Sequence, residues 1–512
     1  MIFTRRASVV AALIAVMLAG TGLWLLAGAA PDLGRKHVVV AGVPLDEVHP
    51  AGLPTGERRP GVVVAHGFAG SARLMAQFGD TLAARGYVVV LLDFAGHGAN
   101  THPLPDGKAI TDASNTALQR DLDVAMTHLR GLPDVDPARV ALVGHSMGAT
   151  AVTRYALAHP EVTATVAISL PDSSFVPPDR PARLLLLVGG LEFPAFRTAV
   201  DHAVEGAGSG RSAVVVPGVE HISILYAPRT HQETVGWLDD SFGGPVADRP
   251  LPAPMRRLTG AGLLLLALLI GLHPVARLLL GGGKSSWPRL DGGKASWPRL
   301  DVLQIGRAMI VAAVAAAVGL LVAPIAPTVR LPLALGGFIV GFTGATGVAM
   351  LAYQLWRGRG RGRGRERERA TGRLRPAIAA PLLIGYAAAT IAVPLQLGLT
   401  NAVPVGARWW LLACVWAGFA VLAYAAERVT DGNSAGVLAV SAVAVFALAG
   451  AAVVGLASSF LVLIVPLLAI LLLWQAIWSA VLHRFAAPAW LIALVGSLIV
   501  AWPIATALPV IG

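Results

Sequence analysis

The chain has 512 residues, of which 55% are hydrophobic and only 13% are charged. Soluble domains carry about twice that charged fraction, so the composition excludes a disordered chain and a wholly soluble enzyme. A single cysteine, Cys414, excludes an internal disulfide framework. The net charge is −6 over residues 31–250 and +17 over the rest. Because the basic excess lies beside apolar runs, and not on a soluble basic face, we expect no nucleic-acid partner.

The chain opens with an apolar run over residues 7–30, directly after Arg5 and Arg6. The run is long enough to span a bilayer as a helix. It predicts an N-terminal transmembrane helix or signal-anchor, with a secretory signal peptide cleaved near residues 27–29 as the alternative. In either case the two arginines keep the N-terminus in the cytoplasm, and the segment that follows is exported.

Residues 31–250 have a soluble composition, and apolar runs then resume to residue 509. Together with the first run they predict nine transmembrane helices. We therefore expect an N-terminal helix over 1–30, a soluble domain over 31–250 and a membrane domain of about eight helices over 251–512. The eight later runs are 259–280, 308–327, 332–356, 377–398, 408–426, 435–456, 459–482 and 487–509.

The polar loops between these runs are basic. Residues 281–307 contain five Lys or Arg, and residues 357–375 contain nine Arg against two Glu. The positive-inside rule places both loops in the cytoplasm and residues 31–250 outside it. Arg256 and Arg257, on the outer side of the second span, do not follow the rule. A near-verbatim repeat of ten residues at 282–301 is interpreted as a duplication within a tethering loop, because solenoids need three or more repeats.

Few ionisable residues fall within the spans. His273 and Arg277 lie in the second span, and Glu427 is expected to cap the sixth at the membrane interface. A proton-coupled carrier needs buried acidic or histidine groups near the middle of the membrane. The helical half is therefore interpreted as an anchor or lipid-facing scaffold.

Residues 31–250 alternate short apolar, β-branched runs with helical stretches that carry one apolar stripe. This alternation predicts an α/β fold with a mostly parallel sheet covered by helices on both faces. Continuous apolar runs suit strands that are buried on both faces. The predicted strands are His37–Ala41, Gly61–Ala65, Tyr87–Asp93, Arg139–Gly144, Thr163–Ser169, Arg183–Val188 and Ser212–Val216.

One of these strands ends in a G-x-S-x-G motif, Gly144-His145-Ser146-Met147-Gly148, and a helical stretch follows it. In this context the glycines permit the sharp strand-to-helix turn that exposes a serine oxygen above a sheet. A serine hydroxyl is a poor nucleophile without a base. Ser146 is therefore a candidate catalytic nucleophile that needs a histidine and a carboxylate.

Residues 60–242 resemble an α/β-hydrolase, on three motifs in the family's order. The nucleophile turn is one, His66-Gly67-Phe68 after an early strand is the second, and Asp93-Phe94-Ala95-Gly96-His97-Gly98 after the next strand is the third. The resemblance implies an oxyanion hole built from the backbone N–H groups of Phe68 and Met147. It also implies that the acid and then the histidine follow the serine along the chain.

In that order, Glu192 follows the strand Arg183–Val188, and His221 follows the strand Ser212–Val216. We expect His221 to be the base and Glu192 to orient it. The family usually has aspartate at the position of Glu192, so Asp172, one strand earlier, is the alternative acid. Only about a dozen residues follow Asp172 before the next strand, which leaves no room for a large lid.

The other histidines of this segment are given no catalytic role. His97 and His145 are expected at the rim of the pocket, and His231 at the surface of the last helix. The sequence has no H-E-x-x-H, cysteine-pair or Walker motif. The expected mechanism needs neither a metal nor a cofactor.

The sequence thus predicts a multi-pass membrane protein whose extracytoplasmic domain is a serine hydrolase acting on a small-molecule or lipid ester through an acyl-enzyme, with membrane lipids as partners. An acyltransferase or a serine peptidase could use the same three residues. A transporter or channel whose hydrolase-like domain only binds ligand is the non-enzymatic alternative. The substrate is not encoded in any motif, because fold does not fix function.

Overall fold

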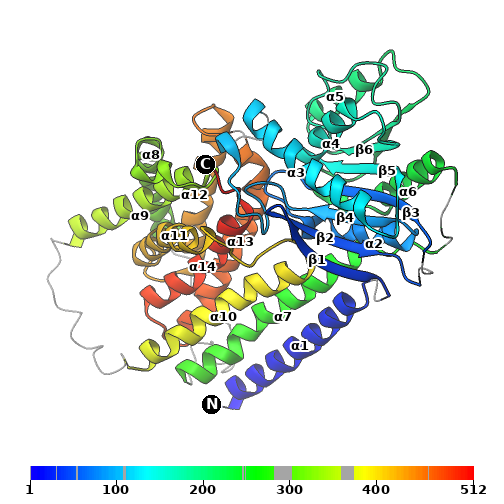
Figure 1. The fold of residues 1–512 in the computed structure, drawn as a ribbon. Helices are drawn as coiled ribbons and strands as arrows, with labels where there is room; N and C mark the ends of the chain where they lie inside the picture. The colour runs from blue at the N-terminus through cyan, green and yellow to red at the C-terminus, as the bar shows by residue number, and fades with distance from the viewer. Residues whose placement is uncertain are drawn as a thin grey trace. The chain divides into compact units, whose positions relative to one another are not determined.

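A computed structural model of the chain describes residues 2–29, 32–52, 56–107, 111–244, 247, 249–281, 302–358, 374–458 and 460–512. Figure 1 shows two compact units, each of which is described by itself. The helical unit comprises Met1–Gly20, Leu263–Val393 and Arg408–Ala505, and the sheet unit comprises Thr21–Gly262, Pro394–Ala407 and Thr506–Gly512. The predicted repeat at 282–301 and most of the arginine loop 357–375 lie outside the described residues.

The described part of the sheet unit is built on one eight-stranded sheet with the order β1-β2-β4-β3-β5-β6-β7-β8. The first two strands pair antiparallel, β2 pairs antiparallel with β4, and all other neighbours are parallel. The predicted mostly parallel sheet is confirmed. The strands are β1 (Gly34–Val40), β2 (Val43–His49), β3 (Arg59–Ala65), β4 (Val88–Leu92), β5 (Val135–His145), β6 (Ala164–Ile168), β7 (Leu184–Gly189) and β8 (Arg211–Val216).

Strand β2 was not predicted from the sequence. Its residues include Pro44, Asp46 and Glu47, which are rare in strands. The structure buries Glu47 and pairs it with His128 and His49, at 2.9 and 3.1 Å. Hydrogen bonds to those two histidines lower the pKa of Glu47 against the opposing effect of its burial. A charged residue can therefore occupy a buried strand here because partners far along the chain satisfy it.

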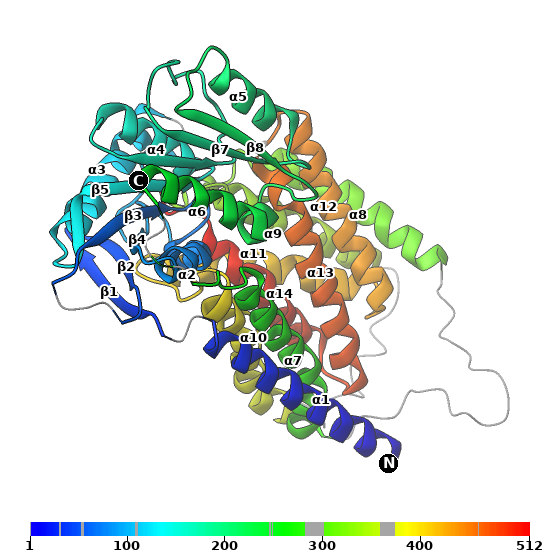
Figure 2. The same ribbon diagram turned by 90° about the vertical axis from the view of Figure 1, so that its right-hand side faces the viewer.

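Helices cover both faces of the sheet, as Figure 2 shows. On one face α2 (Ala76–Ala84) and α6 (Pro228–Phe242) pack against alternate residues of β3 such as Val62 and Val64. On the other face α3 (Asp112–Gly131) and α4 (Met147–Ala158) pack against Val63, and α5 (Pro194–Val204) packs against β7. The apolar stripe of each helix thus meets one side of a sheet that is buried on both sides.

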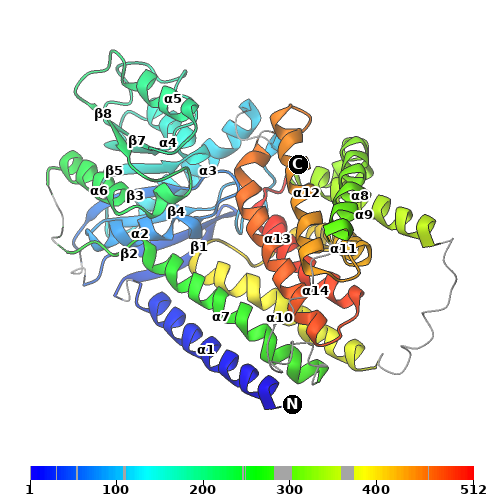
Figure 3. The ribbon, with the colours of Figure 1, turned by 180° about the vertical axis from the view of Figure 1, so that it is seen from behind.

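Among the described residues, nine helices are long and apolar enough to cross a membrane. They agree with the nine predicted spans, and Figure 3 shows them from behind. In the helical unit, α9 packs against α8 and α11, and α12 packs against α8 and α13. The helices are α1 (Ile2–Ala27), α7 (Met255–Leu280), α8 (Val302–Val322), α9 (Gly336–Gly358), α10 (Leu374–Gly398), α11 (Arg408–Val429), α12 (Ser434–Val453), α13 (Phe460–Arg484) and α14 (Ala489–Ala507).

Two buried ionisable groups inside the helical unit have polar partners. Glu427, expected to cap its span at the interface, is buried, accepts a hydrogen bond from the Ser479 hydroxyl and lies 2.7 Å from His483 Nε2. Arg408 is also buried and donates to the Ala505 carbonyl oxygen at 2.9 Å. Such pairing is what charged groups need in an apolar setting.

The two arginines that do not follow the positive-inside rule lie in the first turn of α7 and have structural partners within the sheet unit. Arg256 donates to the Leu25 carbonyl oxygen near the end of α1, at 3.1 Å, and its guanidinium lies 5.3 Å from the ring centre of Trp24. Arg257 forms an ion pair of 2.6 Å with Asp80. Local pairing of these two charges therefore accounts for their position.

Two segments from the apolar half of the sequence complete the sheet unit. After α14, Val510 accepts a backbone hydrogen bond from Leu104 at 2.9 Å and donates one to Gly96 at 2.8 Å. Between α10 and α11, Asn401 donates its backbone N–H to Ser71 Oγ at 3.1 Å. Both segments contact loops that follow the early strands, where the sequence resemblance places the catalytic machinery.

Candidate active site

The turn between β5 and α4 holds Ser146 in a strained backbone conformation with φ 53° and ψ −115°. Non-glycine residues rarely adopt a positive φ, and the strain is a mark of functional turns. The glycines on either side are required by close approach. A Cβ on Gly148 would lie 2.5 Å from the Ala65 carbonyl oxygen, and one on Gly144 would clash with the Gly148 carbonyl. The motif therefore encodes this turn.

Three residues far apart in the sequence meet at the carboxyl edge of the parallel strands. Ser146 Oγ lies 3.1 Å from His221 Nε2, and His221 Nδ1 lies 3.2 Å from Glu192 Oε2. The Glu192 side chain is 1% exposed and that of His221 is 11% exposed. A carboxylate can only accept, so Nδ1 carries the imidazole proton and donates it to Glu192. Nε2 is then the acceptor for the Ser146 hydroxyl, as a general base must be.

The second oxygen of Glu192 has its own donors. Glu192 Oε1 accepts from the Ser169 hydroxyl at 2.6 Å and from the Gly189 backbone N–H at 2.9 Å. Ser169 follows β6 and also has a positive φ, 55°. It was not predicted from the sequence, because one serine after a strand forms no recognisable pattern. These bonds fix the carboxylate in the plane that faces His221.

The alternative acid takes no part in this arrangement. Asp172 is exposed and accepts hydrogen bonds from the backbone N–H and the hydroxyl of Ser174, at 2.9 and 2.8 Å. The structure thus brings Glu192 to His221 and leaves Asp172 in a local turn.

The expected oxyanion donors belong to segments that lie beside the nucleophile. Met147 is the first residue of α4, where backbone N–H groups point away from the helix. A Cβ on Gly67 would lie 3.1 Å from Ser146 Cβ, so the segment that carries Phe68 lies against the serine. Such N–H groups are worth about 3–4 kcal/mol each to an oxyanion transition state.

Asp93 connects the two loops that follow β3 and β4. Its carboxylate accepts from the backbone N–H groups of Ala72 and Ala99, both at 2.7 Å. A Cβ on Gly98 would clash with this carboxylate, which explains the last glycine of the third motif. Burial raises the pKa of Asp93 to about 6. The motif therefore holds the oxyanion segment in place.

The two histidines expected at the pocket rim are buried instead. His145 donates from Nε2 to the His221 carbonyl oxygen at 2.9 Å, and its burial, followed by the nearby His221, lowers its pKa well below the usual value. His97 donates from Nδ1 to the Ala95 carbonyl oxygen at 2.8 Å. Both rings therefore hold nearby backbone carbonyl groups in place and stabilise the local fold of the site. In the part of the chain that the structure describes, no group of three His, Cys, Asp or Glu side chains is placed to hold a metal ion.

The expectation that His231 lies at the surface was wrong. Its ring is buried, stacks on Phe78 at 4.2 Å and bonds to Thr81 Oγ1 at 2.8 Å. Nε2 donates to the Leu225 carbonyl oxygen at 2.9 Å. Burial lowers the pKa of His231 to about 4, so the ring is neutral at pH 7.

Several large apolar residues are adjacent to Glu192 and His221 in the sequence, and one ring contacts His221. Leu191 and Phe193, on either side of the acid in sequence, are 67% and 51% exposed. Ile222, directly after His221, is 46% exposed, and the Phe196 ring lies 4.7 Å from the His221 ring. Exposed apolar groups at a site of this kind favour an apolar ligand.

Comparison with known proteins agrees with the resemblance to α/β-hydrolases found in the sequence. Residues 56–199 match a family model described as serine aminopeptidase, S33. An uncharacterized protein of Mycobacterium tuberculosis is 30% identical over 192 residues, which are 33% of this chain and 64% of that protein, so the chain spans less than two thirds of this relative. Cutinase 1 of Thermobifida cellulosilytica is 29% identical over 108 residues, which are 21% of this chain and 38% of the cutinase.

Among solved structures, a putative dienelactone hydrolase from Klebsiella pneumoniae superposes with a TM-score of 0.32 and 16% identity, over 40% of this chain and 97% of that one. The family match falls in the sheet unit and includes the serine turn of the site. The sheet unit therefore has the α/β-hydrolase fold, joined in one chain to apolar helices that suit a membrane domain.

Proposed function

We propose that the protein is a membrane-anchored serine hydrolase that cleaves an ester-like substrate through an acyl-enzyme. The observation that supports this most directly is the continuous line of contacts from Ser146 through His221 to Glu192, at 3.1 and 3.2 Å. A hydroxyl, an imidazole and a carboxylate in that order are the components of nucleophilic acyl transfer.

In the proposed reaction Ser146 Oγ attacks the carbonyl carbon while His221 Nε2 accepts the hydroxyl proton. The backbone N–H groups of Phe68 and Met147 stabilise the oxyanion. The leaving alcohol takes the proton from His221, and the acyl group stays on Ser146. Water then repeats the sequence and releases the acid. Glu192 holds the imidazole orientation and stabilises the imidazolium, without being protonated.

The surroundings favour an ester with an apolar acyl group, a lipid ester included. The exposed Leu191, Phe193 and Ile222 are sequence neighbours of Glu192 and His221 and are available for apolar contacts. The name of the matched cutinase is consistent with ester chemistry. Membrane anchoring would keep such an enzyme beside substrates that partition into the bilayer.

A peptidase is the second candidate, because the matched family model is described as a serine aminopeptidase. Aminopeptidases need an anionic group for the substrate's ammonium. The acids nearest the triad in sequence are already occupied: Glu192 as described, and Glu220 by the backbone N–H groups of Ile222 and Ser223, at 2.9 and 2.7 Å. We therefore rank ester cleavage first.

The purified full chain in neutral detergent tests the proposal. A fluorophosphonate probe should label wild-type protein and fail to label Ser146→Ala, while the surface variant Ser174→Ala should label normally. Hydrolysis of p-nitrophenyl butyrate should exceed that of an amino-acid p-nitroanilide. Absent labelling of the wild type, or equal labelling of Ser146→Ala, overturns the hydrolase proposal, and preference for the anilide overturns the ester assignment.

The proposed location of the hydrolase domain is outside the cytoplasmic membrane, supported by the basic loops and the N-terminal arginines of the sequence. An impermeant fluorophosphonate added to intact cells should label Ser146. Labelling only after the cells are opened would place the domain on the cytoplasmic side.

A further inference from the structure

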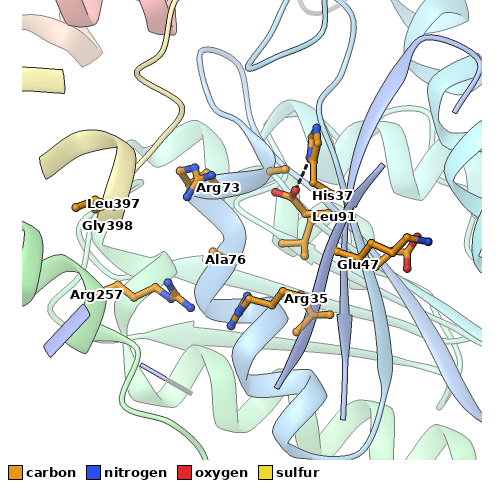
Figure 4. Close-up of a pocket in the computed structure, with 13 residues that line it drawn as sticks. Arg35, His37, Glu47, Arg73, Ala76, Leu91, Arg257, Leu397 and Gly398 are labelled. Atoms are coloured by element: carbon orange, nitrogen blue, oxygen red, sulfur yellow. Dashed lines mark hydrogen bonds and ion pairs between the residues drawn. The ribbon is translucent and has the colours of Figure 1, made fainter. Parts of the chain in front are cut away.

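The sheet unit contains a cavity of about 220 Å³ on the side of β1 and β2, apart from the triad. Figure 4 shows its walls: the β1–β2 hairpin, the start of α2 with the short helix η1 (Ala72–Met75) before it, the first turn of α7 and the end of α10. Four cationic side chains line it, Arg35, Lys36, Arg73 and Arg257. The cavity has no part in the proposed catalytic mechanism.

The positive charge of this cavity is incompletely neutralised. Asp80 is the carboxylate partner of both Arg35 and Arg257, which point toward one another in Figure 4. Two guanidinium groups thus share one carboxylate. Lys36 lies 3.8 Å from Glu47, a carboxylate that also pairs with His128 and His49.

Arg73 is the remaining cation, and it forms no ion pair with any residue that the structure describes. Its side chain is half-buried in the cavity wall, while that of Asp46, the other acid in the wall, is engaged by His37 at 2.8 Å. A partly desolvated guanidinium is costly without an anion and binds phosphate or carboxylate oxygens through two parallel N–H groups. The cavity is therefore matched to an anionic group.

The wall of the cavity includes residues at the ends of two apolar helices, α7 and α10. Arg257 is in the first turn of α7, and Gly398 is the last residue of α10. The two ends touch, since a Cβ on Gly398 would lie 2.6 Å from the Arg257 carbonyl oxygen. Where a spanning helix ends, the phosphate layer of the bilayer begins. A phosphate at this level belongs to a lipid headgroup more readily than to free solution.

We propose that this cavity binds the phosphate group of an anionic phospholipid, held by Arg73 and by the outer N–H groups of Arg35 and Arg257. The two paired arginines keep Asp80 as their structural partner, and Arg73 supplies the unshared charge. The proposal depends on the membrane ends of α7 and α10 and is independent of the triad, so it stands or falls separately from the hydrolase activity.

Native mass spectrometry of the full chain in neutral detergent, titrated with dioctanoyl phosphatidylglycerol, measures the binding directly. Removing one charge-assisted contact with Arg73→Gln should weaken binding about tenfold. Arg197→Gln is the matched control, an exposed arginine on α5 without a carboxylate partner among the described residues. It should bind as the wild type does, and Arg73→Lys should retain part of the affinity.

Because Arg73 forms no ion pair with a residue that the structure describes, its substitution should leave the melting temperature of the lipid-free protein unchanged. If the Arg73 variant does melt at a lower temperature, Lys36→Gln provides the second measurement. Its affinity for dioctanoyl phosphatidylglycerol should fall at least threefold. Equal binding by wild type and both variants overturns the proposal. Equal affinity for dioctanoyl phosphatidylcholine overturns the anionic selectivity, and displacement of the lipid by inorganic phosphate at the same concentration assigns the cavity to free phosphate instead.

Discussion

Replacement of Glu192 by glutamine tests the geometry of the triad most sharply, because the change is isosteric and the hydrogen bonds around it decide its effect. In the native site Oε1 faces two donors, the Ser169 hydroxyl and the Gly189 N–H, and Oε2 faces the His221 Nδ1–H. The glutamine amide keeps both bonds of Oε1 only if its NH₂ group faces His221. Nδ1 must then accept, and the imidazole proton moves to Nε2, which can no longer accept from Ser146.

The reversed amide would restore the productive tautomer at the cost of one hydrogen bond. It would set its NH₂ group against the Gly189 N–H, which can only donate, whereas the Ser169 hydroxyl can turn to accept from the NH₂ group. The lost bond with its unsatisfied donor costs about 1–3 kcal/mol, which corresponds to a productive fraction reduced about 5-fold to 150-fold. Loss of the negative charge beside the imidazolium adds to this, so we expect kcat/KM to fall on the order of 10⁴-fold.

The assay is hydrolysis of p-nitrophenyl butyrate by the detergent-solubilised full chain. Asp172→Asn is the control, and its kcat/KM should stay within about twofold of the wild type because Asp172 bonds only within its own turn. The double variant Ser169→Ala/Glu192→Gln should regain no activity over Glu192→Gln, since the Ser169 hydroxyl can accept from either amide orientation and opposes neither. If Glu192→Gln keeps more than about a tenth of wild-type activity, Glu192 does not orient His221 and the reasoning fails.

Three further predictions concern the fold around the site. Gly148→Ala should lower the thermal stability by about 2 kcal/mol or more, because its Cβ would meet backbone at 2.5 Å, whereas Gly131→Ala, with nothing within 4 Å, should be nearly neutral in the same melting experiment. Burial lowers the pKa of His231 to about 4, so its contribution to the free energy of unfolding should be complete above pH 6.5 and should fall by roughly 1.4 kcal/mol per pH unit as the pH drops toward 4. Urea unfolding of His231→Asn measures this, and a free energy of unfolding with the same pH dependence as that of the wild type would contradict it. Deletion of residues 508–512 removes the backbone partners of Leu104 and should speed amide hydrogen exchange in the loop around it; unchanged exchange would show that the tail does not support the loop.

The placement of the triad could be predicted from the sequence because parallel strands bring their carboxyl ends to one edge. The strands before Ser146, Glu192 and His221 each contain a continuous apolar run, and each residue follows its strand within a few positions. The turn glycines are equally local signals. Such features depend only on neighbours in the chain, which is why a single sequence was enough to place them.

The features that were missed depend on partners distant in the sequence. The charge of Glu47 makes the segment of β2 resemble a loop in the sequence. Its place in a buried strand is explained only by its pairing with His128, far along the chain. His231 looks like a surface residue until Thr81 and Phe78 are placed beside it, about 150 positions earlier. Ser169 gains its significance only from Glu192. Periodicity carries no information about such pairs.

The backbone bridge between Leu104 and Ile511 has a consequence for biosynthesis. Synthesis proceeds at about 5–20 residues per second, so the second half of this bridge leaves the ribosome roughly 20–80 s after the first. During that interval the eight apolar helices α7–α14 of the described chain are made, and the loop that contains Leu104 still lacks its backbone partners near Val510. The sheet unit can therefore complete this bridge only after the last of these apolar helices has been synthesised, so these backbone contacts form late in synthesis.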